Sequence, residues 1–260
     1  MTPVYLIIGN GRLAKHFTCY LKLLELKYSQ YQRGDTMESF YQKIRLASHI
    51  LVLINDDAID AFIEDKLYNF LDEKIIIHCS GALQSAYAYS VHPLMSFGYS
   101  LYDIETYRSI PFICEKIPLQ VSTTSVTQTT TLLPRKNLEF KQLLPGFQNK
   151  FYYIDPQNKS YYHALCVIAN NFTTILWQGV KKRMLDNVGL EFSAMAAISR
   201  QTMLNINTDI DNALTGPLSR NDEKTIQNHL AILDNDAIAI LYKAFDQFYR
   251  IELAERAVVR

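Results

Sequence analysis

The stretch Gly9-Asn10-Gly11-Arg12-Leu13-Ala14 decides the fold. It follows a short apolar run, Val4–Ile8, and opens a segment whose apolar residues recur at helical spacing. In a Gly-x-Gly-x-x-Ala turn between a strand and a helix, the first glycine permits the tight turn and the second lets a pyrophosphate approach the backbone. The small Ala14 lets the helix pack closely on the strand, and the first N–H groups of the helix face the phosphates. We therefore predict that this turn binds a dinucleotide; the alternative is a glycine turn kept only for packing.

Strand-like and helix-like segments alternate through the first 155 residues. Residues 50–54 form a continuous apolar run between polar residues, which is typical of a strand buried on both faces. Residues 75–77 form another, and the amphipathic segment 58–70 lies between them. This alternation predicts βαβ units around a parallel sheet. Further strands are predicted at 27–33, 89–92 and 150–154, and further helices at 12–26, 38–47 and 138–144.

The second half of the chain has a different pattern. From residue 160 onward, apolar residues recur at a period of 3.6 in long segments, which predict helices over 160–187, 191–211, 221–233 and 236–257. The fold class is therefore α/β, with an N-terminal Rossmann-type dinucleotide-binding domain (residues 1–155) followed by an all-helical C-terminal domain (residues 156–260). The Ser/Thr-rich residues 118–134 fit either an extended hairpin or a loop.

The composition excludes several classes of function. Lys+Arg and Asp+Glu both number 26, and this zero net charge gives no field to attract nucleic acid or an anionic membrane. The apolar runs are too short to span a bilayer, and no basic stretch leads into a signal-peptide core, so we expect a cytoplasmic protein. Cys19, Cys79, Cys114 and Cys166 stand singly and the six histidines are dispersed, which predicts reduced thiols and no metal site.

The end of the second predicted strand bears on the choice of cofactor. NAD-binding folds usually place an acidic residue there, on the ribose hydroxyls. Here the strand ends Gln30-Tyr31-Gln32-Arg33, and the first carboxylate is Asp35. Arg12 and Arg33 would suit the 2′-phosphate of NADP(H), because a guanidinium matches phosphate oxygens in a bidentate geometry. We therefore predict NADP(H) rather than NAD; the alternative for each arginine is a solvated surface charge.

Two further loops are expected to meet the cofactor, because ligands bind at the carboxyl ends of the strands in open α/β sheets. The first contains Asn55 and Asp56, although Asp56 or Asp57 could instead be the N-cap of the next helix. The second contains Ser80 and Gly81, which we place near the nicotinamide. The predicted cofactor-binding residues are Gly9, Asn10, Gly11, Arg12, Leu13, Arg33, Asn55, Asp56, Ser80 and Gly81.

Several stretches resemble one family: residues 4–14, 78–83, 91–94, 162–164, 170–171, 213–222 and 229–230. The chain resembles Rossmann-like oxidoreductases with a helical C-terminal domain of unknown function. These are distant relatives of pyrroline-5-carboxylate reductase and of the 6-phosphogluconate-dehydrogenase-like enzymes. One branch resembles the alternative type of ketopantoate reductase, which reduces 2-dehydropantoate (ketopantoate) with NADPH in pantothenate and coenzyme A biosynthesis. The resemblance implies this reaction, and a homodimer formed through the helical halves.

A nicotinamide reductase needs a proton donor and groups that orient the substrate. His163 is the nearest counterpart to the catalytic lysine of the usual ketopantoate reductases. Seven residues separate it from Asn170, two turns on one helix face, and Asn171 lies about 80° away. We predict His163 as the acid and Asn170 and Asn171 as catalytic partners. A packed core histidine with structural asparagines is the alternative.

Three residues are predicted to bind a 2-oxo acid substrate: Ser80, His92 and Arg220. Arg220 would hold a carboxylate, unless it only pairs with Asp222 or Asp211. His92 would close the cleft, unless His92-Pro93 is only a strand-ending turn. Two other functions fit the same residues: reduction of another small oxo acid or an imine, and non-catalytic binding of NADP as a sensor or assembly factor.

Overall fold

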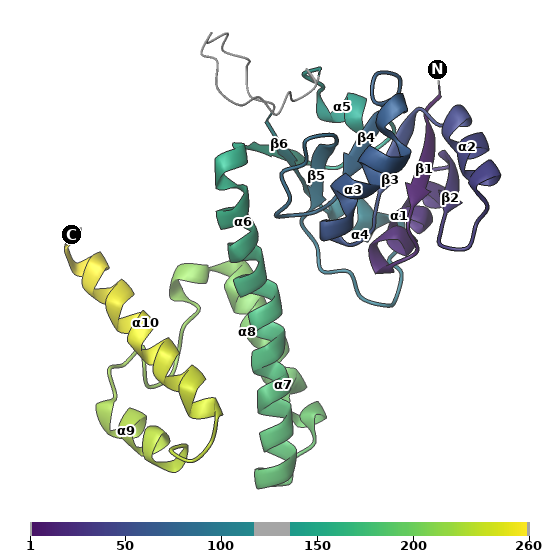
Figure 1. Ribbon diagram of the computed structural model, residues 1–260. Coiled ribbons are helices and arrows are strands. Elements are labelled where there is room, and N and C mark those ends of the chain that lie inside the picture. Colours follow the sequence, from purple (N-terminus) through teal and green to yellow (C-terminus); the bar gives the residue numbers. More distant parts are fainter. Residues whose placement is uncertain (1, 117–135, 259–260) are drawn as a thin grey trace. The chain divides into compact units, whose positions relative to one another are not determined.

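The structure is a computed structural model that describes residues 2–116 and 136–258, with side chains to residue 252. The chain divides into two compact units, Met1–Asn171 and Phe172–Arg260. The first contains a seven-stranded sheet with helices, and the second is helical (Figure 1). The predicted fold class is confirmed. The predicted domain limits at residues 155 and 156 stay a prediction, and residues 118–134 lie outside the described residues.

The sheet has the strand order β2-β1-β3-β4-β5-β6-β7. Neighbouring strands are parallel, except that β5 and β6 are antiparallel. The order reverses around β1, whose two neighbours are β2 and β3, and such a switch point is where open α/β sheets bind ligands. The strands are β1 (Val4–Ile8), β2 (Lys27–Tyr31), β3 (His49–Val52), β4 (Ile75–His78), β5 (Tyr89–Pro93), β6 (Phe112–Glu115) and β7 (Phe151–Ile154).

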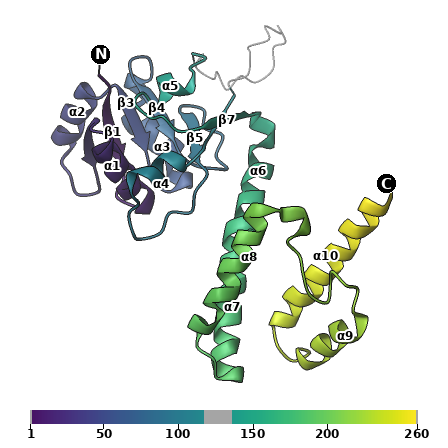
Figure 2. The ribbon, with the colours of Figure 1, turned by 180° about the vertical axis from the view of Figure 1, so that it is seen from behind.

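Helices cover both faces of the sheet (Figures 1 and 2). Alternate residues of β1 enter different cores, because side chains along a strand alternate between its faces. Tyr5 and Ile7 pack with α1 (Arg12–Leu23) and α4 (Ile104–Ser109). Leu6 and Ile8 pack with α2 (Met37–Leu46) and α3 (Asp56–Lys66). The short helix α5 (Phe140–Leu143) belongs to the first core.

Two elements of the sheet unit were not predicted, α4 and β6. The helix α4 has only six residues, and its N-cap Asp103 accepts a hydrogen bond from the N–H of Thr106 at 2.8 Å. The strand β6 has four residues, and it pairs with β5 and β7. The pattern did not reveal them, although β3 and β4, which are as short as β6, were predicted from their continuous apolar runs.

The predicted helix over 160–187 is not one regular helix. It begins as α6 (Lys159–Cys166) and passes through a π-helical turn, η3 (Val167–Phe172). It then continues as α7 (Thr173–Arg183) and a second π turn, η4 (Met184–Val188). The other elements are α8 (Ala196–Thr208), α9 (Glu223–Ile232), α10 (Ile238–Val258), η1 (Tyr68–Phe70), η2 (Pro156–Asn158), η5 (Phe192–Met195) and η6 (Ile210–Asn212). Within the described ranges, no helix has the length and apolar character needed to cross a membrane.

Candidate functional site

Gly9 and Gly11 of the turn are glycines for different structural reasons. Gly9 has φ +120°, and a Cβ built there would lie 2.2 Å from the carbonyl oxygen of Leu53. Backbone conformation and the close approach of β3 therefore both require glycine at this position. Gly11 has an ordinary φ of −71°, and a Cβ built there would meet no atom within 4 Å. Neither packing nor conformation within the described residues requires a glycine at position 11, which leaves the approach of a ligand as its reason.

The start of α1 is suited to an anion. Gly11 is the N-cap, no side chain caps the helix, and no acidic residue lies in the first turn. The first N–H groups of the helix and its dipole are therefore available to phosphate oxygens. The turn is also fixed in place: the N–H of Gly9 donates to the Tyr31 carbonyl at 2.9 Å, and the Gln30 side chain donates to the Gly9 carbonyl at 2.7 Å. Ala14 is fully buried behind the turn.

A cavity of about 570 Å³ opens beside this turn, at the switch point of the sheet. It brings together five of the predicted cofactor-binding residues, which come from the loops after β1, β2 and β3: Gly9, Asn10, Gly11, Arg33 and Asn55. Its apolar walls, which were not predicted, include Tyr31, Leu53, Ile54 and Phe62. In the sequence these residues look like ordinary core, so only their place in the fold reveals them.

Charged and polar residues follow β2 in the chain. Arg33 is exposed and lines the cavity. The nearest carboxylate, Asp35, is already engaged: it lies 3.1 Å from the Lys43 ammonium and accepts from the Gln32 N–H. The hydrogen bond from Lys43 is the main reason why the pKa of the Asp35 carboxyl is lowered. Arg12 does not line this cavity; its guanidinium lies 5.5 Å from the centre of the Tyr99 ring.

A hydrogen bond joins the loops after β3 and β4. The Ser80 hydroxyl donates to the Asp56 carboxylate and accepts from the N–H groups of Ala82 (3.2 Å) and Leu83 (2.9 Å). The alternative that Asp56 is an N-cap is wrong, because Asn55 holds that position, without a side-chain cap, and Asp56 is the first residue of α3.

Leu13, another predicted residue, is half-buried against the first core.

His163 lies against the loop that follows β4. A Cβ built on Gly81 would lie only 2.2 Å from the Nδ1 of His163. That nitrogen is buried and has no hydrogen-bond partner among the residues that the structure describes. The ring of His92, at the end of β5, lies 5.8 Å from the His163 ring at an angle of 90°. Ser80, Gly81, His92 and His163, all predicted from sequence, thus gather at the carboxyl ends of β4 and β5.

Tyr162 completes this cluster. Its hydroxyl lies 2.7 Å from the Nδ1 of His92. Burial, followed by the nearby His163 and Lys159, lowers the pKa of His92 from 6.5 to about 4. Burial also raises the pKa of the Tyr162 phenol. Both groups are therefore neutral at neutral pH.

Lys159 is a functional candidate that the sequence analysis missed. It is the first residue of α6 and is only 2% exposed. Its ammonium lies 2.9 Å from the Glu115 carboxylate and also donates to the Leu83 carbonyl. In the sequence it looks like a surface lysine at a helix start. Its spacing of three and four from Tyr162 and His163, which puts all three on one helix face, was the available signal.

The roles of Asn170 and Asn171 stay a prediction. Both are exposed, and the side chain of Asn170 donates to that of Asn171 at 3.0 Å. The prediction that His163 and Asn170 share one face assumed a regular α-helix. The π turn η3 contains both asparagines and has more residues per turn. The seven-residue spacing therefore does not by itself align Asn170 with His163.

Arg220 belongs to the helical unit and is exposed. Its neighbour Asp222 caps α9, where it accepts from the N–H and hydroxyl of Thr225 at 3.1 and 2.8 Å. These hydrogen bonds are the main cause of the lowered pKa of Asp222, and the charge of Arg220 adds to it. The proposed contact of Arg220 with a substrate carboxylate stays a prediction.

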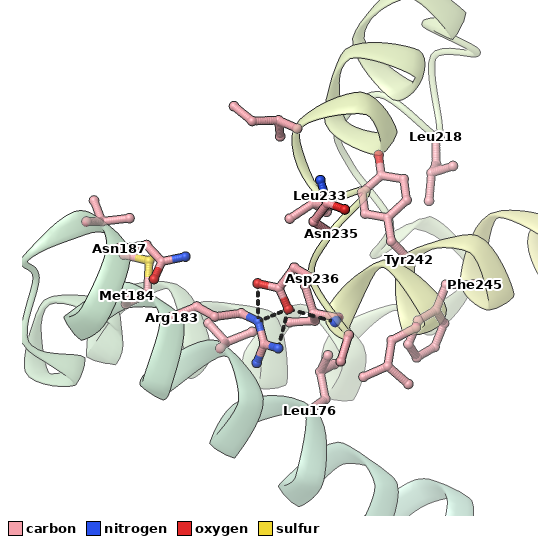
Figure 3. Close-up of a pocket in the computed structure, with 16 residues that line it drawn as sticks. Leu176, Arg183, Met184, Asn187, Leu218, Leu233, Asn235, Asp236, Tyr242 and Phe245 are labelled. Atoms are coloured by element: carbon pink, nitrogen blue, oxygen red, sulfur yellow. Dashed lines mark hydrogen bonds and ion pairs between the residues drawn. The ribbon is translucent and has the colours of Figure 1, made fainter.

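A second cavity, of about 880 Å³, lies within the helical unit (Figure 3). Its lining is mostly apolar and includes Leu176, Met184 and Phe245. Two charged residues in the lining, Arg183 and Asp236, pair with each other. The Nε of Arg183 lies 2.7 and 2.8 Å from the two carboxylate oxygens of Asp236. The cavity contains none of the predicted site residues, so we place the chemistry at the sheet.

Comparison with solved structures identifies three similar chains of nearly the same length. A candidate NADP oxidoreductase of Bacteroides fragilis is 19% identical, with a TM-score of 0.69, and the match covers 95% of this chain and 98% of that one. A protein of Thermotoga maritima is 21% identical (TM-score 0.66; 97% and 99% covered). A reductive aminase of Aspergillus terreus, solved with NADPH and ethyl levulinate, is 9% identical (TM-score 0.59; 98% and 95% covered). These likenesses establish the fold.

Sequence comparisons add one family. Comparison with the curated proteins finds no match. Residues 134–248, which run from the end of the sheet unit through most of the helical unit, match the family described as Domain of unknown function (DUF2520).

Proposed function

We propose that this protein is an NADP(H)-dependent reductase of a small carbonyl compound. The observation that carries the proposal is the meeting of Gly9, Gly11, Arg33 and Asn55 around one cavity at the switch point of the sheet. Gly11 is the strongest element of this observation, because the residue is open to solvent, has an unstrained backbone and lies at the uncapped start of α1. A pyrophosphate would need this bare backbone.

The proposed cofactor is NADP(H) rather than NAD. Arg33 would pair with the 2′-phosphate at the end of β2, since it lines the cavity and forms no ion pair with any residue that the structure describes. Asp35, the acid nearest to this place, is held by Lys43. Asn10, Leu13 and Asn55 would contact the cofactor along the turn and the loop after β3. Arg12, beside Tyr99, would reach the phosphates only if it left that ring.

The reaction follows from the cluster at β4 and β5. A bound, reduced nicotinamide supplies the hydride. Ser80, fixed by Asp56, and Gly81 would border the nicotinamide. His163 would donate a proton to the oxygen on which negative charge develops, and His92 would bind the same oxygen. Asn170, Asn171 and Arg220 stay proposed substrate contacts.

The specific substrate that we propose is ketopantoate, reduced to pantoate. The likeness to the alternative ketopantoate reductases supports this choice, and no feature of the cavity distinguishes ketopantoate from other 2-oxo acids. Reduction of an imine is the second candidate. It is favoured by the likeness in fold to a reductive aminase crystallised with NADPH.

The test is NADPH oxidation followed by absorbance, with ketopantoate, related 2-oxo acids and a cyclic imine as substrates, each beside NADH. We expect turnover with NADPH and a 2-oxo acid. Turnover of the imine alone would replace ketopantoate with the second candidate. Tight NADPH binding without turnover of any substrate would contradict a reductase and favour a sensor.

We also propose a homodimer formed through the helical unit. Large apolar side chains of α8 and α10 are exposed, among them Leu204 (56%), Phe245 (53%) and Phe248 (60%). Exposed apolar patches of this kind mark protein interfaces, and a two-fold pair of identical faces is the commonest way to cover one. Light scattering coupled to gel filtration should give twice the chain mass. A monomer at micromolar concentration would refute this proposal.

A further inference from the structure

A hydrogen bond to Tyr162 holds His92 in the candidate site. The phenolic oxygen of Tyr162 lies 2.7 Å from the Nδ1 of His92, and the two rings meet at 78° with centres 5.7 Å apart. The bond joins the end of β5 to the first turns of α6, so it fixes the ring to two elements at once. Within the described residues, His92 makes no other hydrogen bond.

The direction of this hydrogen bond depends on the tautomer of the ring. The phenol of Tyr162, which also interacts with the thiol of Cys166, can donate to a bare Nδ1 or accept from a protonated one. The bare nitrogen of a neutral imidazole is a good acceptor, and donation from the phenol is compatible only with a bare Nδ1. In a neutral ring the proton then lies on Nε2.

The surroundings keep the ring neutral. Burial is the main cause, and His163 and Lys159, both on α6, act in the same direction. Lys159 is itself paired with Glu115 of β6 at 2.9 Å, which reduces its share of the effect. No described acidic residue lies close enough to raise the proton affinity of His92.

We propose that Tyr162 is a positioning residue that locks His92 in its Nε2–H tautomer, so that His92 presents a neutral hydrogen-bond donor to the substrate oxygen. This inference rests on the proposed reductase function. A fixed neutral donor stabilises the negative charge that develops on that oxygen during hydride transfer, and it needs no reorganisation. It leaves the proton transfer itself to another group, for which His163 is the proposed candidate.

The tautomer can be tested in the cofactor-free protein, independently of turnover. Two-bond ¹H–¹⁵N correlation spectra of protein labelled with ¹⁵N-histidine distinguish a protonated from a bare ring nitrogen, and the spectrum of His92→Gln assigns the signals. At pH 7 we expect bare Nδ1 and protonated Nε2 for His92, and a mixture of tautomers in Tyr162→Phe. A protonated Nδ1 in the wild type, or an unchanged pattern in Tyr162→Phe, would overturn the lock.

The kinetic test uses variants that preserve one side of the ring. The amide nitrogen of Gln can replace the Nε2 donor and that of Asn the Nδ1 position, so His92→Gln should retain at least about tenfold more kcat than His92→Asn, a difference in barrier of about 1.4 kcal/mol. Tyr162→Phe should lower kcat about tenfold and leave the dissociation constant of NADPH within about twofold. Tyr161→Phe, at the exposed neighbouring tyrosine, is the matched control.

The outcomes separate this inference from the function on which it rests. If the wild type turns over a carbonyl substrate and Tyr162→Phe matches it in kcat, the role of Tyr162 is refuted while the reductase stands. If the spectra show the Nε2–H tautomer but the wild type reduces no substrate, the reductase fails, and with it the donor role of His92. Equal kcat losses in His92→Gln and His92→Asn would also contradict the donor role.

Discussion

The imidazole of His163 lies directly on the backbone of Gly81, with Nδ1 where a side chain at position 81 would begin: a Cβ built there would be 2.2 Å away. Gly81 has no left-handed φ, so the close approach of the ring is what demands glycine here. Gly81→Ala should therefore displace His163. We expect kcat to fall at least tenfold, about 1.4 kcal/mol in barrier height.

The control for Gly81→Ala is Gly98→Ala, where a Cβ would meet no atom within 4 Å. It should keep wild-type kcat and melting temperature. The decisive comparison is between kcat and the dissociation constant of NADPH, since moving an acid slows turnover more than it weakens cofactor binding. A Gly81→Ala protein with wild-type kcat would show that His163 does not act at its present position.

The two glycines of the cofactor turn should respond differently to alanine. Gly9→Ala forces a left-handed residue against the Leu53 carbonyl, so it should lower the free energy of unfolding by about 1–3 kcal/mol. Gly11→Ala meets no atom, so its melting temperature should stay near that of the wild type while its affinity for NADPH falls. Thermal unfolding and fluorescence titration measure the two effects. Unchanged NADPH affinity in Gly11→Ala would mean that no ligand approaches this backbone.

Most of the sheet unit could be predicted because its signals are local. The apolar run before Gly9 and the run at 50–54 correspond to β1 and β3, and the turn between β1 and α1 follows from the glycine spacing. The short elements α4 and β6 escaped, because their few residues include charged side chains and so lack the continuous apolar runs that revealed β3 and β4. The π turns escaped because nothing in their composition marks them.

The site was predictable only in part, for a physical reason. Ser80, Gly81, His92 and His163 could be chosen because each stands at a strand end or on a helix start. Their contacts depend on tertiary packing, which no local pattern encodes. Tyr162 was quoted only as part of a resemblance, and Lys159 was missed altogether, because a lysine gives no sign in the sequence that it is buried beside a carboxylate.

Arg33 should determine how much more tightly the protein binds NADPH than NADH. The residue lines the cavity at the end of β2 and is exposed. Arg33→Ala should weaken NADPH binding about tenfold and leave NADH binding within about twofold, because only NADPH carries the 2′-phosphate. Arg45→Ala, at an exposed arginine of α2 outside the cavity, is the matched control. Equal losses for the two cofactors would count against a 2′-phosphate contact.

Lys159 and Glu115 should stabilise the folded protein only while both are present. Lys159 is 2% exposed and Glu115 has a side-chain exposure of 17%. Lys159→Met would leave the Glu115 carboxylate without its cation, and it should lower the free energy of unfolding by about 3 kcal/mol. Adding Glu115→Leu should recover much of that loss, since two apolar residues leave no uncompensated charge. Urea unfolding of the three variants measures this coupling, and a double variant less stable than Lys159→Met would contradict it.

His92 should make the protein sensitive to acid over a defined range. Its pKa is about 4 in the folded protein, below the ordinary value of 6.5, because burial, followed by the neighbouring His163 and Lys159, disfavours its charged form. The unfolded chain therefore binds a proton at His92 more tightly than the folded chain does. The contribution of the neutral ring to the free energy of unfolding is fully present above pH 6.5. It is lost as the pH falls from 6.5 towards 4, and the loss is at most about 3 kcal/mol.

His92→Gln removes this titration, so the difference in unfolding free energy between pH 7.5 and pH 4.5 should be smaller in the variant than in the wild type. Burial also lowers the pKa of His49, but that residue is present in both proteins and cancels in the comparison. Urea unfolding at the two pH values provides the four free energies needed. An equal loss of stability in both proteins would mean that His92 titrates in the folded state as it does in the unfolded chain, and that its buried surroundings do not hold the ring neutral.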